Sequence, residues 1–401
     1  MYNRASSLTH RITVAVKAFK PELPINQLHN ALQPSSYSKG RLSHTQNKFV
    51  LTPTQSTTAY YSTLPFTQQR TMANQPSKSA VRSLWQDLEK DTLTLINRPI
   101  PEPKPNSDEH LIRVHATALC AGELSWPKSF PIQGKQEIIP GYDLAGTVVT
   151  APETSQFAAG SQVYARTNYV RPGCARDYTI AVTSELALRP RNLSWAESAT
   201  IPLSALTAWQ ALFVQGGLGG PENPENKGKR VFITAASGGV GLWVVQLARI
   251  AGLHVSVSCG SENEQFVRDL GANEVVDYKT TSITAWAAAD ENRKVDLVID
   301  CFGNQTLKDA WGAVRDGGTL ISIVQPPEER KPANCTAKNV KNFFFIMEPN
   351  GAQLAKITEL VLLGKCHGVL DSTFKLEEFE QAFAKVDTRR ARGKVVLSVH
   401  E

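Results

Sequence analysis

The sequence has few cysteines, no long apolar run and, in its first 71 residues, almost no acid. Its six cysteines are far apart in 401 residues and include no Cys-x-x-Cys pair. This spacing argues against a zinc ribbon and a disulfide scaffold, and it is typical of a reducing compartment. No apolar stretch approaches the roughly 18 residues that a membrane span needs, and no internal repeat is visible. What remains is a globular chain long enough for two domains and a tail.

The first 71 residues differ in charge from the rest. They hold eight Lys or Arg and a single acid, Glu22, whereas residues 72–401 hold 35 basic and 36 acidic residues. Because this stretch is basic, rich in Ser and Thr and has apolar residues at helical spacing, residues 1–72 are predicted to be a leader to the mitochondrial matrix. The alternatives are an extension without an address, or a cytoplasmic protein that starts at Met72. The near-neutral remainder predicts no nucleic-acid partner.

The chain is organised around a glycine-rich turn, TAASGGVG, at residues 234–241. An apolar run at 229–233 predicts a buried strand before it, and the largely apolar 240–251 predicts a buried helix after it. Glycines let the backbone approach a phosphate closely, and the free N–H groups at a helix start point at the anion. The alternative is a tight turn that binds no ligand.

Strands and helices alternate after this turn. The predicted strands are 254–258, 275–277, 295–301, 319–324 and 343–347. The predicted helices are 262–270, 281–289 and 304–315. Together with the strand before the turn, this order predicts an α/β fold with a six-stranded doubly wound Rossmann sheet, which we place at residues 205–347.

The residues that follow the predicted strand 254–258 bear on the choice of cofactor. An acid there would bind the ribose diol of NAD, but this chain has Gly260, which leaves room for a 2′-phosphate. The sequence therefore favours NADPH. Glu262 is the alternative, as a ribose partner after a small register shift. No Lys or Arg lies within 259–263, so a charge partner for the phosphate must come from elsewhere.

Residues 73–204 have a β-rich pattern broken by Gly and Pro, which predicts a partly open barrel. Its predicted strands are 92–96, 110–119, 144–149 and 162–166. Ser194 and Glu197 form a capping-box pattern for a helix start. Residues 348–401 contain a predicted helix from 350 to 364 and an alternating closing strand at 391–399, so we expect them to return to the first domain.

Seven stretches, in order, carry a family resemblance. They are PGYDLAGTVV, IPLSALTAWQALF, TAASGGVG, LGANEVVDY, VDLVIDCFG, DGGTLISI and ARGKVVLSV. On them the chain resembles the zinc-free medium-chain dehydrogenases/reductases of the quinone oxidoreductase (zeta-crystallin-like) group, over about residues 90–401. The resemblance implies a GroES-like catalytic domain beside the Rossmann domain, NADPH as cofactor and a homodimer.

The resemblance also bears on zinc. Cys120 matches the first zinc ligand of related alcohol dehydrogenases, but the Gly-His-Glu motif reads Gly141-Tyr142-Asp143 here, and tyrosine is not an ordinary zinc ligand. We therefore expect no metal, and Cys120 to be a small buried side chain. Without a Lewis acid the acceptor must take a hydride readily, as quinones and α,β-unsaturated carbonyls do. Tyr142 is a weak candidate to donate a hydrogen bond to the substrate oxygen, with hinge packing as the alternative, and Asp143 is expected to be a scaffold residue.

Cofactor-binding residues follow from the resemblance by position. The pyrophosphate is expected on Ser237, Gly238, Gly239, Val240 and Gly241. The 2′-phosphate is expected among Gly260, Ser261, Asn263 and Tyr278. The nicotinamide half is expected near Phe302, Val324, Phe345 and Ile346. Lys394 matches a family lysine that reaches the cofactor, with a solvated end-strand charge as the alternative.

Three functions remain open on the sequence. The first is an NADPH-dependent reductase of a small quinone or enone. The second is an enoyl-thioester reductase of lipid or polyketide synthesis. The third is an NADPH-binding protein with little turnover.

Overall fold

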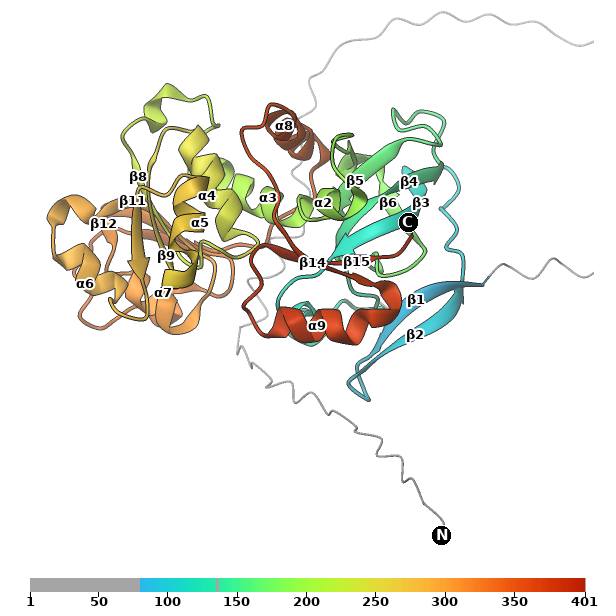
Figure 1. The fold of residues 1–401 in the computed structure, drawn as a ribbon, viewed down its shortest axis with the longest axis horizontal. Coiled ribbons are helices and arrows are strands. Elements are labelled where there is room, and N and C mark those ends of the chain that lie inside the picture. Colours follow the sequence, from blue (N-terminus) through green and yellow to red (C-terminus); the bar gives the residue numbers. More distant parts are fainter. Residues whose placement is uncertain (1–79, 135–136, 401) are drawn as a thin grey trace, which may run out of the picture. The chain divides into compact units, whose positions relative to one another are not determined.

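The computed structural model describes residues 80–134 and 137–400, so the predicted leader lies outside the described residues. All of the described residues belong to one compact unit. Its described strands form a two-stranded, a six-stranded and a seven-stranded sheet (Figure 1). The domain boundaries proposed within this unit, after 204 and after 347, stay predictions.

The six-stranded sheet confirms the predicted Rossmann fold. Its strands lie in the order β10-β9-β8-β11-β12-β13, and all neighbours are parallel. The strands are β8 (Arg230–Ile233), β9 (His254–Cys259), β10 (Glu274–Asp277), β11 (Val295–Asp300), β12 (Val314–Ser322) and β13 (Lys341–Phe344). The order in which the strands are added reverses between β8 and β11, and sheets of this kind bind a nucleotide at the carboxyl ends of the strands at that point.

Helices cover both faces of this sheet. They are α4 (Gly241–Ile250), α5 (Glu264–Leu270), α6 (Ile283–Ala288) and α7 (Asn304–Ala310). Successive residues of β8 face opposite sides: Val231 packs in the cluster that contains α4, whereas Phe232 packs with Trp286 of α6. The helix predicted at 304–315 is wrong at its end. It stops at Ala310 because β12 already begins at Val314, where it pairs with β11.

The seven-stranded sheet joins strands from residues 109–188 with strands from the C-terminal part of the described chain. Its strands are β3 (Glu109–Ala118), β4 (Asp143–Thr150), β5 (Gln162–Arg166), β6 (Tyr178–Val182), β7 (Ala187–Leu188), β14 (Leu370–Lys375) and β15 (Lys394–Ser398). β15 pairs antiparallel with β3, so the red C-terminal strands lie beside the cyan β3 in Figure 1. The C-terminal strands thus belong to the same sheet as β3 to β7, while the assignment of residues 348–401 to a returning part of the catalytic domain stays a prediction.

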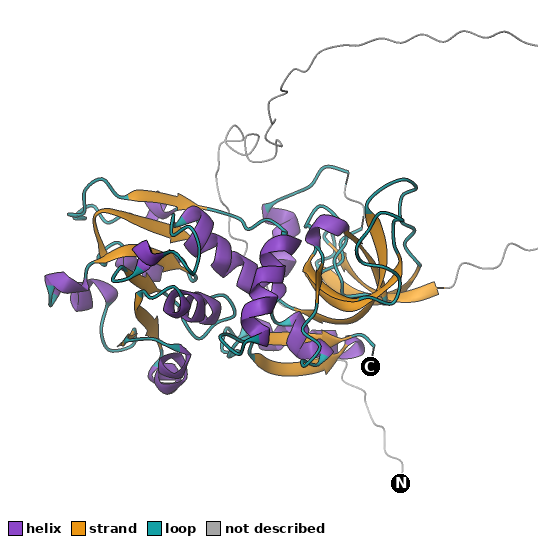
Figure 2. Cartoon of the chain, turned by 90° about the horizontal axis from the view of Figure 1, so that it is seen from above, coloured by secondary structure: helices purple, strands orange, loops and turns teal. Residues whose placement is uncertain are grey.

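The remaining elements surround these two sheets (Figure 2). β1 (Ala80–Asp87) and β2 (Thr92–Pro99) form a hairpin. The other helices are α1 (Trp126–Ser129), α2 (Trp195–Ala199), α3 (Pro202–Trp209), α8 (Gly351–Leu362) and α9 (Phe379–Asp387), and α3 continues as a π-helix to Gln215. The Ser194–Glu197 capping box is present as predicted at the start of α2.

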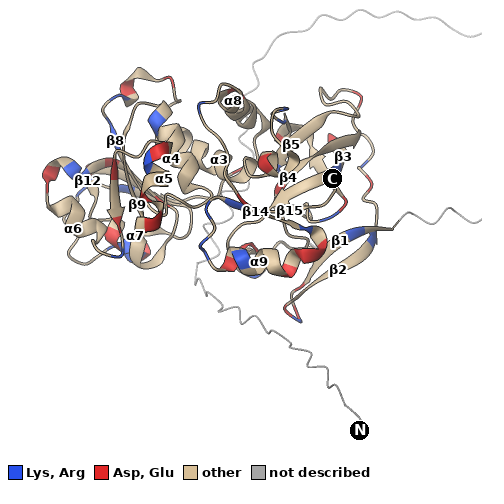
Figure 3. Ribbon diagram, viewed as in Figure 1, with Lys and Arg blue, Asp and Glu red and all other residues tan. Residues whose placement is uncertain are grey.

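Positions of Lys and Arg are interspersed with positions of Asp and Glu along the ribbon in Figure 3. None of the helices in the described residues is both long enough and apolar enough to cross a bilayer.

Candidate active site

The glycine-rich turn joins β8 to α4 through a strained backbone. Ala235 has a φ of 50°, in the left-handed region that favours glycine. A Cβ on Gly241 would lie 2.3 Å from the Ala235 carbonyl oxygen, so the turn can close only with glycine there. A Cβ on Gly238 would meet no protein atom within 4 Å except the same oxygen, at 3.3 Å. The turn is therefore closely packed at Gly241 and less crowded at Gly238. This arrangement fits a pyrophosphate bound by the N–H groups of the turn.

The segment before β15 closes one side of this turn. The Gly393 N–H donates to the Ser237 carbonyl oxygen at 3.2 Å, and Gly393 forms a β-bridge with Gly238. A Cβ on Gly239 would lie 3.0 Å from Cδ of Lys394. Lys394 belongs to the C-terminal motif ARGKVVLSV and was predicted to reach the cofactor. The tertiary fold brings it against the turn that is predicted to bind phosphate.

Apolar side chains stand exposed at the carboxyl ends of three adjacent strands. Phe302 follows β11 and is 41% exposed, Val324 follows β12 and is 44% exposed, and Ile346 follows β13 and is 54% exposed. Phe345 is half-buried beside them. Exposed large apolar groups gathered in one place indicate a ligand surface. The structure thus brings together the residues predicted for the nicotinamide half.

The predicted adenosine end lies at the carboxyl ends of β9 and β10. Gly260 follows β9, and Ser261 and Asn263 lie in the short helical turn after it. Tyr278 follows β10, the neighbouring strand, and is 58% exposed. These four predicted residues therefore occupy one corner of the sheet.

A buried charged cluster lies next to the phosphate turn. Lys394 Nζ donates to Cys120 Sγ at 2.9 Å and is 3.1 Å from Asp143 Oδ2. The other oxygen of Asp143 accepts the Leu203 N–H at 2.6 Å. Burial alone would lower the pKa of Lys394, but the contacts with Cys120 and Asp143 raise it above its ordinary value. Lys394 is therefore a buried ammonium group fixed by these two contacts, and not a solvated charge at the end of a strand.

The thiol in this cluster is not activated. Burial raises the pKa of Cys120 to about 12, against the opposing effect of Lys394. A thiol of this pKa is protonated at neutral pH, and the thiolate is the nucleophilic form. The geometry thus supports no nucleophilic role for Cys120.

Glu123 is a member of this cluster that the sequence analysis missed. Its two carboxyl oxygens accept the N–H groups of Cys120 and Gly141, each at 2.7 Å. Burial raises its pKa to about 7, against the lowering by these two bonds. Glu123 thus ties the segment that carries Cys120 to the segment that carries Tyr142. The sequence signal that could have pointed to Glu123 is its position three residues after Cys120.

Tyr142 belongs to an aromatic group. Its ring lies 5.9 Å from that of Trp126 and 5.4 Å from that of Tyr169, and the Arg166 guanidinium lies over it at 5.5 Å. The residue is 3% exposed, and burial raises its pKa, so its hydroxyl stays protonated. The ring has the packing role that the sequence analysis gave as its alternative, while hydrogen bonding to a substrate stays a prediction.

Asp300, at the end of β11, is a second residue that the sequence analysis missed. Its carboxylate accepts from the Thr234 hydroxyl, the Ser322 hydroxyl and the Gly303 N–H. These partners follow or end three different strands. A fully buried acid with so many donors orders the loops from which Phe302 and Val324 project.

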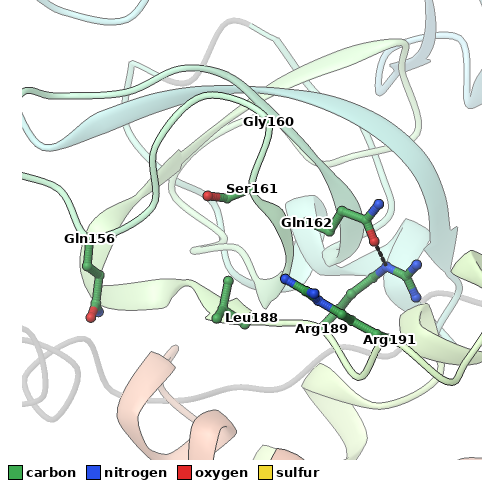
Figure 4. Close-up of a pocket in the computed structure, with 7 residues that line it drawn as sticks. All are labelled: Gln156, Gly160, Ser161, Gln162, Leu188, Arg189 and Arg191. Carbon is green, nitrogen blue, oxygen red and sulfur yellow. Dashed lines mark hydrogen bonds between the residues drawn. The ribbon is translucent and has the colours of Figure 1, made fainter.

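Figure 4 shows a pocket that lies apart from these residues, on the seven-stranded sheet. It is lined by Gln156, Gly160, Ser161, Gln162, Leu188, Arg189 and Arg191. Arg189 donates to Gln162 at 3.1 Å and stacks over Trp195 at 4.0 Å. No predicted site residue lines this pocket, and the contacts of Arg189 are structural.

The comparisons with known proteins agree with this geometry. Two family models match: an alcohol dehydrogenase GroES-like domain at residues 106–203 and a zinc-binding dehydrogenase at 270–397. A "probable zinc-binding oxidoreductase, mitochondrial" of Arthroderma benhamiae is 59% identical over 79% of this chain and 96% of its own. A chloroplastic quinone-oxidoreductase of Triphysaria versicolor is 33% identical over 74% and 92%. A solved quinone oxidoreductase from Coxiella burnetii covers 80% of this chain and 100% of its own, at a TM-score of 0.68 and 23% identity.

The fold and the site define a dinucleotide-dependent oxidoreductase built from a GroES-like and a Rossmann sheet. The chain belongs to the medium-chain dehydrogenase/reductase family, in its quinone oxidoreductase group. Members of this family bind NAD(H) or NADP(H) at the Rossmann sheet, and the turn at Gly238 and Gly241 fits that group.

The residues of this chain do not fit the zinc that two of these names mention. Cys120 Sγ accepts from the Lys394 ammonium, and a buried cation at this distance would repel a metal ion. Tyr142 stands where the ligand histidine would be. Within residues 80–134 and 137–400, no group of three or more His, Cys, Asp or Glu is arranged to hold a metal ion.

Proposed function

We propose that this protein is an NADPH-dependent oxidoreductase that transfers a hydride to a quinone or an α,β-unsaturated carbonyl without zinc. The observation that carries the proposal is the Cys120–Lys394–Asp143 cluster, in which an ammonium group lies against the thiol that matches a zinc ligand. The name of the Triphysaria relative, a quinone-oxidoreductase, supports the acceptor class.

Bound NADPH would supply the hydride. Ser237, Gly238, Gly239, Val240 and Gly241 would bind its pyrophosphate. Phe302, Val324 and Ile346 would form the apolar surface that orients its nicotinamide half and excludes water. No covalent intermediate and no catalytic triad are needed, because the acceptor itself delocalises the added electron pair.

The buried ammonium gives the site a fixed positive charge. Lys394 is 5% exposed and is held by Asp143, so its charge needs no reorganisation during the reaction. Because Lys394 lies against the glycine-rich turn, this preorganised charge would stabilise the negative charge of a bound dinucleotide.

The test is oxidation of NADPH and NADH by the full chain with a panel of quinones, 2-alkenals and an enoyl-CoA, with and without a chelator. The expected result is NADPH oxidation by a quinone or an alkenal at a rate that the chelator leaves unchanged. Turnover with enoyl-CoA alone would move the assignment to enoyl-thioester reduction. NADPH binding without any turnover would leave a binding protein, and inhibition by chelator would refute the zinc-free site.

We also propose a homodimer in the mitochondrial matrix. The basic, acid-poor first 71 residues and the printed name of the Arthroderma relative support the location. β13 is an edge strand of the six-stranded sheet and leaves one side of its backbone free to pair with a second copy. Organelle fractionation and light scattering in solution test the two statements.

A further inference from the structure

The corner of the sheet beyond β9 contains an unusual placement of an acid. The Glu262 side chain folds back over Gly260, so that a Cβ on Gly260 would lie 2.5 Å from Glu262 Oε2 and 2.7 Å from Oε1. In a doubly wound sheet, the residue after the second strand borders the adenosine ribose. A carboxylate of this chain therefore occupies the space beside the expected ribose.

Basic side chains from two distant segments surround this carboxylate. Lys279, just after β10, donates from Nζ to Glu262 Oε2 at 2.9 Å. Arg392, just before β15, donates to Asn263 Oδ1 at 3.0 Å and to the Glu262 carbonyl oxygen at 3.3 Å. Arg390 adds to the positive potential at Glu262. Basic side chains thus converge at a corner where the sequence between 259 and 263 offers none.

Arg392 is held in place by its neighbours. Its N–H donates to Asp371 Oδ1 at 2.8 Å, and its guanidinium lies over the Phe266 ring at 4.9 Å. The next residue, Gly393, bonds to the phosphate turn. Arg392 is thus aimed at the adenosine corner by the same segment that closes the pyrophosphate turn.

We propose that Lys279 and Arg392 bind the 2′-phosphate of NADPH, and that the Glu262 carboxylate holds their place until the phosphate displaces it. This inference rests on the proposed function and names the residues that choose between NADPH and NADH. Glu262 can leave, because its side chain is 58% exposed. A phosphate carries more charge than a carboxylate and offers three oxygens, so it satisfies both cations better.

The test is direct binding of NADPH, NADH and 2′,5′-ADP to the full chain by calorimetry. The last probe carries the 2′-phosphate but no nicotinamide. Lys279→Ala and Arg392→Ala should each weaken NADPH and 2′,5′-ADP by about tenfold or more, since each removes charge-assisted hydrogen bonds, and should leave NADH within about twofold. Glu262→Gln should tighten NADPH. The matched control is Arg268→Ala, because the Arg268 guanidinium pairs with Glu264 on the same helix, α5. This variant should change the affinity for none of the three ligands.

The outcomes separate the two proposals. An unchanged ratio of NADPH to NADH affinity in both cation variants would overturn the phosphate site and leave the proposed function standing. Tighter binding of NADH, lost in Glu262→Gln, would make Glu262 a ribose ligand and overturn the inference. The expected binding pattern in a protein that reduces no acceptor would overturn the proposed reaction alone. No binding of either dinucleotide would overturn both.

Discussion

At the scale of single residues, the site depends on charges kept out of water. Lys394 and Asp143 are 5% and 0% exposed and lie 3.1 Å apart. Each is tolerated in the interior because of the other. Removing one partner from such a pair leaves an uncompensated buried charge, whereas removing both is often neutral.

Lys394→Met should therefore destabilise the fold by about 3–5 kcal/mol in urea unfolding, because Asp143 loses its counter-charge. The double variant Lys394→Met/Asp143→Asn should recover much of this loss, since an amide oxygen can still accept the Leu203 N–H. A single variant as stable as the wild type would mean that the ion pair is not formed.

His115 makes stability depend on pH. Its ring is buried and stacks on Trp195 at 4.0 Å, and burial, with Arg113 nearby, lowers its pKa to about 4. The unfolded chain, with a His pKa near 6.5, binds the proton first, so stability should fall as pH drops from about 6.5 to about 4. His115→Gln should remove this component from the pH dependence of the melting temperature.

Thr147→Val is the control for that measurement. It removes the 3.1 Å contact between the Thr147 hydroxyl and His115 Nε2 but keeps the titrating ring. Its pH profile should keep the slope that His115→Gln loses. Equal slopes in the wild type and in His115→Gln would show that folding does not lower the pKa of His115.

At the scale of elements, the β8–α4 turn separates a structural from a binding requirement. Gly241 packs against the Ala235 carbonyl, while Gly238 faces open space apart from that same atom. The two glycines lie three residues apart in one turn, yet the backbone gives them different tasks.

Gly241→Ala should cost about 1–3 kcal/mol of stability, because the added methyl group overlaps the backbone at Ala235. Gly238→Ala should cost less stability, since its methyl group meets the Ala235 oxygen at 3.3 Å and not at 2.3 Å, and should weaken NADPH binding if the pyrophosphate lies on this turn. Thermal melts and calorimetry on both variants check this. Equal losses of stability in the two variants would refute this difference between Gly241 and Gly238.

At the scale of the whole molecule, a bound cofactor should stabilise the fold because it contacts two separate segments of the chain. The predicted binding residues come from the Rossmann sheet and from the segment that enters the seven-stranded sheet at β15. A ligand that binds only the native state stabilises it by about 2.7 kcal/mol at a concentration of 100 Kd.

NADPH should thus raise the melting temperature in a concentration-dependent way, which differential scanning fluorimetry measures. NADH at the same concentration should raise it less, and Arg392→Ala should narrow the difference between the two. A melting temperature that NADPH leaves unchanged would contradict the proposed cofactor.

Much of the fold was predictable because its signals are local. Apolar runs of strand length, separated by helices and a glycine turn, predicted the order of the Rossmann elements. The Ser194–Glu197 pattern likewise predicted the start of α2. The end of α7 was not predictable in this way, since the pairing of Val314 with Val295 competes with the helix and is invisible in the local sequence.

The sequence by itself determined the family, the glycine-rich turn and the apolar residues at the strand ends, because these depend on residue types at fixed spacing along the chain. Only the tertiary structure decided what surrounds them. Lys394 meets Cys120 and Asp143, and Arg392 meets Asn263, across more than 120 residues of chain. Such charges are paired by the return of β15 to β3, and no spacing in the sequence encodes that contact directly.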